Sequence, residues 1–176
     1  MSQRNILAKE DGTIVIADFG YSRVLHSKRR EATTPASVTR AYRYLAPEVI
    51  APDATFQPTP QTDIYALAMT IVELGTGELP FREISNPDFL LNKVIQPTNR
   101  RPKSENSLGH LGEECTGELW KYLEEMWHAE AEERPEVAIV RKSVEALRER
   151  YRKSVPLGQA VRVWNTWEVT TRTEEF

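Results

Sequence analysis

An amide and a carboxylate near the N-terminus have the chemistry of ligands for a small cation. Asn5 and Asp18 lie at the outer ends of two short apolar stretches, which flank the pair Asp11-Gly12. That pair suits the two-residue turn of a β-hairpin, and counting outwards from it places Asn5 opposite Asp18. Directly opposed side chains in a hairpin have Cβ atoms about 4.5–5.5 Å apart, and hard cations prefer oxygen ligands. We therefore predict that Asn5 and Asp18 can bind one metal ion.

The same count sets Leu7 opposite Ile16 in the hairpin. A shift of one residue would turn every side chain of one strand to the other face. The predicted cation site therefore depends on the register of the two strands.

A basic segment rich in hydroxyl groups follows the hairpin. Residues 21–44 show no sustained apolar period, so we predict a loop, and a loop of this length inside a domain is often functional. A phosphate in this loop would add negative charge close to several arginines. A solvated surface loop is the alternative. The candidate phosphorylation sites are Thr33, Thr34, Ser37 and Thr39.

Three helices are predicted downstream, so the fold class is mainly α with a short β-hairpin. Residues 63–74 are apolar on nearly every face and are followed by Gly75, which is typical of a helix in the middle of a domain. A second helix is predicted with Thr116 as its cap, and a third with Pro135 in its first turn. Residues 97–117 are predicted to form a loop. The apolar stripes of the two later helices are Leu119, Tyr122, Leu123, Met126 and Trp127, and Val137, Val140, Val144, Leu147 and Tyr151.

Length, charge and cysteine content exclude several classes of protein. The chain has 176 residues, enough for one compact domain, and 23 basic against 26 acidic side chains give a net charge of −3, which argues against a nucleic-acid binder. The single Cys115 cannot form an internal disulfide, and the three histidines lack the spacing of a zinc site. No apolar run is long enough to span a membrane, and the N-terminus does not resemble a secretion signal. We expect a cytoplasmic protein.

Several motifs occur in the order and spacing of a known family. Asn5-Ile6-Leu7, Asp18-Phe19-Gly20 and Ala46-Pro47-Glu48 resemble the end of the catalytic loop, the metal-binding triplet and the end of the activation segment of eukaryotic protein kinases. The stretch from Tyr42 to Glu48 is most similar to the tyrosine-kinase-like serine/threonine branch. Further matches to the C-terminal lobe of that family are Thr62-Asp63-Ile64-Tyr65, Leu79-Pro80-Phe81 and Arg134-Pro135.

The resemblance extends from residue 5 to about residue 151 and implies a partial domain. Residues 1–153 would form a protein-kinase-like C-terminal lobe, the N-terminal lobe being absent from this sequence, and residues 154–176 would form a tail. In the family the catalytic loop reads H-R-D-x-x-x-x-N, which puts the catalytic base before Met1. The Gly-rich loop and its phosphate-binding lysine are also missing from these residues. We therefore expect no catalytic base and negligible phosphotransfer by this chain alone.

The resemblance also implies cofactors and their ligands. Family members use ATP and Mg²⁺, and the positions that match the metal ligands are Asn5 and Asp18. Leu7 resembles the residue that forms the floor beneath the adenine ring, although an apolar residue is equally expected in any strand.

Three further residues resemble structural positions of the family. Glu48 and Arg134 match an ion pair that ties the activation segment to the helical lobe. Asp63 matches an aspartate that accepts hydrogen bonds from the catalytic-loop backbone, and the alternative is a first-turn carboxylate favoured by the helix dipole. Where relatives carry Gly-Thr before the Ala-Pro-Glu motif, this chain has Arg40-Ala41, so substrate docking is expected to differ.

The predicted function is therefore part of an ATP-dependent protein kinase. The reaction implied is transfer of the γ-phosphoryl group of ATP to Ser or Thr hydroxyls of protein substrates, with Tyr left open. The alternative is a non-catalytic kinase-like interaction module, a pseudokinase, which offers its helical lobe to a docking partner. Trp164 and Trp167 in the tail are candidates for that role. In either case the expected partner is a protein, and neither a nucleic acid nor a membrane.

Overall fold

The described part of the chain is mainly helical with one two-stranded hairpin, so the predicted fold class is confirmed. The computed structural model describes residues 6–9, 14–17, 35–50, 59–95 and 113–154. The elements in these ranges are strands β1 (Ile6–Ala8) and β2 (Ile14–Ile16), helices α2 (Pro35–Tyr42), α3 (Pro47–Ile50), α4 (Pro60–Thr76), α5 (Pro87–Ile95), α6 (Glu113–Met126) and α7 (Val137–Ser154), and the 3₁₀ helix η3 (Ala131–Glu133).

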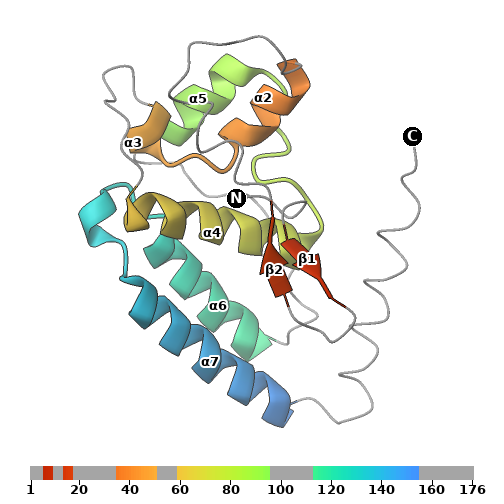
Figure 1. The fold of residues 1–176 in the computed structure, drawn as a ribbon, viewed down its shortest axis with the longest axis vertical. Coiled ribbons are helices and arrows are strands. Elements are labelled where there is room, and N and C mark those ends of the chain that lie inside the picture. Colours follow the sequence, from red (N-terminus) through yellow and green to blue (C-terminus); the bar gives the residue numbers. More distant parts are fainter. Residues whose placement is uncertain (1–5, 10–13, 18–34, 51–58, 96–112, 155–176) are drawn as a thin grey trace.

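Helix α4 lies between two groups of helices (Figure 1). Helices α2, α3 and α5 lie on one side of it, and α6 and α7 lie on the other. The side chains of Tyr65, Ala68 and Met69 are fully buried, and they belong to one continuous core with residues of α5 and α6. A helix that is apolar on nearly every face is stable only when other elements cover it. The predicted central position of this helix is confirmed.

Both ends of α4 lie beyond the predicted ones. Thr59 is the N-cap: its Oγ1 accepts a hydrogen bond from the Thr62 N–H at 3.2 Å, and the Thr62 Oγ1 accepts one from the Thr59 N–H at 3.1 Å. Pro60 occupies the first helical position, where no amide hydrogen is needed. The predicted stop at Gly75 is wrong, because a glycine is tolerated inside a helix. The helix ends at Gly77, whose φ of 69° gives the left-handed cap.

Helix α6 presents the predicted apolar stripe to the core, although its start was misplaced. It begins at Glu113, so Thr116 lies inside the helix and is not its cap. The predicted loop over 97–117 is therefore wrong for its last residues, and residues 96–112 lie outside the described ranges. The rings of Trp120 and Trp127 meet edge to face, with centroids 5.4 Å apart. This aromatic contact ties the residue after the helix to its middle turn.

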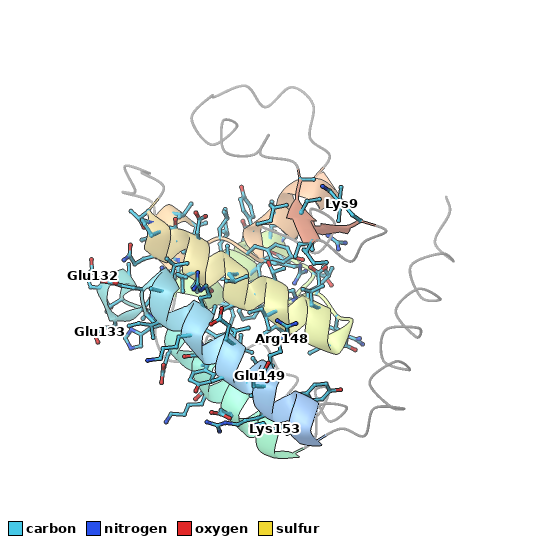
Figure 2. The ribbon with its side chains drawn as sticks, turned by 60° about the horizontal axis from the view of Figure 1, so that its bottom comes forward. Lys9, Glu132, Glu133, Arg148, Glu149 and Lys153 are labelled. Carbon is cyan, nitrogen blue, oxygen red and sulfur yellow. The ribbon has the colours of Figure 1, made fainter. Side chains whose placement is uncertain are left out.

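Only part of the predicted stripe of α7 is covered. Val140 is buried, and Leu147 and Tyr151 are half-buried, but Val137 and Val144 are exposed. The helix contacts α6 along a narrow face, so flanking valines reach the solvent. Pro135 lies two residues before the helix and is not in its first turn. Figure 2 shows charged side chains along the outer surface, including Arg148, Glu149 and Lys153 of α7.

The short helices α2 and α5 were not predicted. Residues 35–42 form α2, so the predicted loop over 21–44 is wrong for this part, and residues 18–34 lie outside the described ranges. Helix α5, residues 87–95, buries Leu90 and Val94. Helices of eight and nine residues span little more than two turns, too few for an apolar period to be evident.

The register of the hairpin differs by one residue from the predicted one. Ile6 pairs with Ile16, and Leu7 with Val15, whereas the prediction paired Leu7 with Ile16. Ala8 pairs with Ile14, so five residues separate these paired positions. A two-residue turn requires an even number, and the prediction from Asp11-Gly12 alone was therefore wrong. The argument that residues 5 and 18 are opposite each other used the same register, so it is no longer supported.

Two further features of the sequence, the tail and the absence of a membrane-spanning run, were also compared with the structure. The tail, residues 155–176, lies outside the described ranges, and so do Trp164 and Trp167. No helix in the ranges that the structure describes is both long and apolar enough to cross a bilayer.

The reciprocal cap at the start of α4 leads to a stability prediction. Thr59→Ala should lower the free energy of unfolding by about 1 kcal/mol, because the Thr62 amide loses its acceptor. Thr59→Ser keeps the hydroxyl and should stay close to the parent. Urea unfolding followed by circular dichroism measures both, and equal losses in the two variants would contradict the capping role.

Candidate functional site

A buried arginine and a glutamate join two segments that are far apart in the sequence. The Arg134 guanidinium donates to both carboxylate oxygens of Glu48, from Nη1 to Oε1 at 2.6 Å and from Nη2 to Oε2 at 2.8 Å. The Arg134 side chain is completely buried, whereas that of Glu48 is 36% exposed. Two parallel charge-assisted hydrogen bonds fix the relative orientation of the groups as well as their distance. The structure thus brings these two predicted residues into direct contact.

The remaining contacts of Arg134 extend the link to other elements. Its Nε donates to the His128 carbonyl at 2.9 Å, Nη1 to the Gln61 carbonyl at 3.0 Å, and Nη2 to the Ala129 carbonyl at 3.3 Å. All five N–H donors of the guanidinium are therefore used. The guanidinium carbon also lies 5.1 Å from the centre of the Tyr65 ring. One side chain holds α3, the first turn of α4 and the turn after α6 together.

Local structure places both partners of this ion pair. Pro47 begins α3 and Glu48 lies in its first turn, where a carboxylate interacts favourably with the helix dipole. Arg134 follows η3, and its amide donates to the Ala131 carbonyl at 3.2 Å. Pro135 comes next, and a residue before proline is directed away from helical geometry. The chain therefore turns at Arg134 before α7 begins.

A second buried ion pair connects α2 to the last turn of α4. Arg40 Nη2 lies 3.0 Å from Glu73 Oε1, and the Glu73 side chain is only 3% exposed while that of Arg40 is 31% exposed. Tyr44 is buried beside this carboxylate. Burial, and then the neighbouring Glu73, raise the pKa of the Tyr44 hydroxyl well above its ordinary value. Glu73 thus relies on a cation supplied by α2.

A third arginine holds the loop that follows α4. Arg43 donates to three backbone carbonyls, those of Pro80 at 2.8 Å, of Phe81, and of Ile84 at 2.7 Å. Phe81 is buried with a φ of 55°, a left-handed conformation that is unusual for a bulky residue. Burial lowers the pKa of the Arg43 guanidinium, and the nearby Glu83 is among the groups that act in the opposite direction. Arg43 therefore fixes a strained turn against the segment that precedes α3.

The other predicted site residues are not shown in contact with one another. Asp63 is exposed in the first turn of α4, and its contact with the catalytic-loop backbone stays a prediction. Leu7 is on β1, 50% exposed, next to Val15 across the hairpin. Asn5 and Asp18 lie outside the described residues. Within the described ranges, no group of three or more His, Cys, Asp or Glu side chains is arranged to hold a metal ion.

Two of the four candidate phosphorylation sites lie within the described residues and two lie outside them. Thr33 and Thr34 lie outside the described residues, and the backbone of Ser37 is in α2. Thr39 is half-buried in α2 next to Arg40. The modification of these hydroxyls therefore stays a prediction.

Comparison with known sequences identifies the family. The family described as protein kinase domain matches residues 1–145. This chain is a member of the protein kinase family. The match covers most of the chain and is a comparison of sequence, so it does not depend on the hairpin register.

Individual protein kinases are similar at modest identity. The proto-oncogene serine/threonine-protein kinase mos of Mus musculus is 28% identical over 145 residues, which are 82% of this chain and 40% of that protein. The serine/threonine-protein kinase TNNI3K of the same species is 32% identical over 155 residues, 84% of this chain and 16% of that protein. The human dual specificity mitogen-activated protein kinase kinase 7 is 34% identical over 95 residues, 52% of this chain and 22% of that protein. The chain thus spans well under half the length of these kinases.

Two contacts of this kinase chain were missed by sequence reasoning. Arg40 was identified only as a departure from the family pattern, and Arg43 only as part of a motif. A signal for the first was present, because Glu73 is the one charged residue of this helix beyond its first turn. A buried carboxylate requires a partner, so a cation on a neighbouring element could have been expected. No comparable signal indicated that Arg43 binds carbonyl groups.

The contacts of Arg134 lead to a prediction about stability. Arg134→Ala should lower the free energy of unfolding by about 3–5 kcal/mol, because Glu48 loses its counter-ion and three carbonyls lose their donor. Arg150→Ala is the matched control, since its ion pair with Glu118 is more exposed and should contribute no more than about 1 kcal/mol. Chemical denaturation gives both values, and similar losses in the two variants would contradict the anchoring role.

The pair of Arg40 and Glu73 leads to a prediction about asymmetry. Arg40→Met leaves a carboxylate buried without its cation and should destabilise by about 3 kcal/mol. Glu73→Gln leaves an arginine that can turn towards water, and should cost about 1 kcal/mol. The double variant should be more stable than Arg40→Met alone. Thermal and chemical unfolding test this order, and a double variant that is simply the sum of the two losses would contradict coupling.

Proposed function

We propose that this chain is the helical, substrate-binding part of an ATP-dependent protein kinase that phosphorylates Ser or Thr hydroxyls of proteins. Family membership supports the reaction class. Two of the similar kinases are named serine/threonine-protein kinases, which supports Ser and Thr as acceptors. The third is named a dual specificity kinase, so Tyr is kept as a further acceptor.

The observation that carries this proposal is the anchoring of residues 39–50 to the helical core. In the family this stretch corresponds to the end of the activation segment. Arg40 fixes it to α4, Arg43 to the loop after α4, and Glu48 to Arg134. A surface that aligns a protein hydroxyl for phosphoryl transfer must be held by rigid elements, because small displacements of the reacting groups reduce the rate strongly. Three arginine contacts supply that rigidity.

Metal and nucleotide would be held by residues at the N-terminal hairpin. The Asn5 amide and the Asp18 carboxylate supply the oxygen ligands that Mg²⁺ prefers, and this donor chemistry is the basis of the fit. Leu7 offers an apolar side chain of which half the surface is accessible, suited to contact with a planar base. When bound, the metal neutralises negative charge on the phosphates during transfer. These three residues would bind and orient the metal and nucleotide, and none of them matches the family's catalytic base.

These 176 residues alone are expected to transfer no phosphoryl group. They contain no H-R-D aspartate, Gly-rich loop or phosphate-binding lysine of the family pattern. Loss of a general base typically removes about 10²–10⁴ in rate, and loss of the phosphate cradle removes positioning as well. Phosphotransfer therefore requires these parts in addition to the 176 residues.

Nucleotide titration tests this division of roles. Mg·ATP should bind the 176-residue chain no more tightly than about millimolar by calorimetry, because only one wall of the nucleotide site is supplied. Asp18→Asn should abolish even this binding, and the exposed Glu132→Gln is the control. Low-micromolar affinity would contradict the proposal that half of the site is elsewhere.

Sequencing of the genomic DNA upstream of the Met1 codon separates the kinase from the pseudokinase alternative. An in-frame H-R-D directly before Met1, with a lysine-bearing strand and a Gly-rich loop before it, is the expected result. An upstream frame that encodes a domain without these residues would favour a non-catalytic interaction module.

A further inference from the structure

The outer face of α5 exposes a large aromatic side chain. Phe89 is 69% exposed, whereas its neighbours Leu90 and Val94 on the inner face are completely buried. Helix α5 lies at the edge of the molecule, on the opposite side of α4 from α6 and α7 (Figure 1). Exposure of such a large apolar ring to water is unfavourable, and exposed aromatic side chains are typical anchors of protein interfaces.

The surface around Phe89 carries an acidic side chain before α5 and a basic side chain near the end of this helix. Asn92 and Lys93 follow Phe89 at helical spacings of three and four and share its face. Glu83 and Ile84 precede the helix, and all five side chains line one groove. Neither Glu83 nor Lys93 forms an ion pair with any other residue in the described ranges. The groove is thus acidic before the start of α5 and basic near its end.

The groove is held in a fixed shape before any partner binds. The Asn86 side-chain oxygen accepts hydrogen bonds from the Asp88 and Phe89 amides at 2.8 and 3.3 Å and so caps α5. Arg43 binds the Ile84 carbonyl at 2.7 Å from beneath. A preformed surface loses little conformational entropy on association.

We propose that this surface binds a second copy of the same chain, with the two α5 helices packed antiparallel across a twofold axis. In a twofold contact every pairing occurs twice: if one residue of the first copy meets a second residue of the other copy, the reverse pairing is also formed. Glu83 of one copy would then face Lys93 of the other, twice, and the two Phe89 rings, which lie next to the axis between these pairs, would pack against each other. Antiparallel packing also places the positive N-terminal end of each helix dipole beside the negative C-terminal end of the other. This proposal does not depend on the proposed catalytic role.

The charge arrangement favours a second copy over a partner of uniform charge. A uniformly acidic or basic segment would meet one favourable and one repulsive end, whereas the twofold arrangement satisfies both. One short helix with its preceding turn is a small contact, so we expect a weak and reversible dimer. Its occupancy should therefore depend on protein concentration.

Sedimentation velocity of the full 176-residue chain over a range of concentrations tests the proposal. The parent should show a reversible equilibrium between monomer and dimer. Phe89→Ala should weaken dimerisation at least tenfold, because it removes the anchor. Glu83→Lys and Lys93→Glu should each weaken it by a similar factor, because each places like charges opposite one another.

A mixing experiment distinguishes this interface from any other route of association. An equimolar mixture of the Glu83→Lys chain and the Lys93→Glu chain should associate at least as tightly as the parent, because every facing pair is then of opposite sign. Glu132→Lys and Lys142→Glu are controls with the same charge changes at exposed positions of η3 and α7, and α7 lies on the other side of α4 from α5 (Figure 1). A parent that stays monomeric to millimolar concentration, or dimerisation that is insensitive to Phe89→Ala and not restored by mixing, would overturn the proposal.

Discussion

The arrangement of this helical domain depends on one completely buried guanidinium. Arg134 is removed from water, and its charge is stabilised only where a carboxylate and three carbonyls converge on it. That requirement fixes α3 and the start of α4 relative to the turn after α6. Two other arginines also hold buried polar groups: Arg40 pairs with the Glu73 carboxylate, and Arg43 binds carbonyls of the strained turn at Phe81. The segment from residue 39 to 50 is therefore held both by polar contacts of arginines and by Tyr44 and Ala46, which belong to the apolar core around α4.

The helices that could be predicted are those whose burial follows a clear periodic pattern. The apolar run of α4 and the stripe of α6 identify both helices, because burial on a large surface dominates local preferences. Their ends were misplaced where a local interaction decides the boundary, as the Thr59 and Thr62 side chains do for α4. Helices α2 and α5 are too short to show a period, and the hairpin register was wrong because one turn pair could not establish the number of loop residues.

The candidate site was predictable to the extent that the family motifs describe it. The motifs named Glu48 and Arg134, which the structure brings into contact, but they carried no information about the carbonyls around Arg134. The pairing of Arg40 with Glu73 depends on how α2 packs against α4, which the family pattern does not include. Asn5 and Asp18 lie outside the described residues, so their metal-binding role stays a prediction. Membership of the kinase family is unaffected by the register error, since the family match is a comparison of sequence.

The distance along the chain between Glu48 and Arg134 has a consequence for synthesis on the ribosome. The two residues are 86 positions apart, and translation at about 5–20 residues per second therefore separates their appearance by roughly 4–17 s. Throughout that interval Glu48 lacks the guanidinium that it binds in the finished domain, and for most of it the core residues of α4 lack Leu123 and Met126 of α6. A nascent chain of this kind presents apolar surface long enough to engage chaperones, and the domain closes only after nearly all of its helices have emerged.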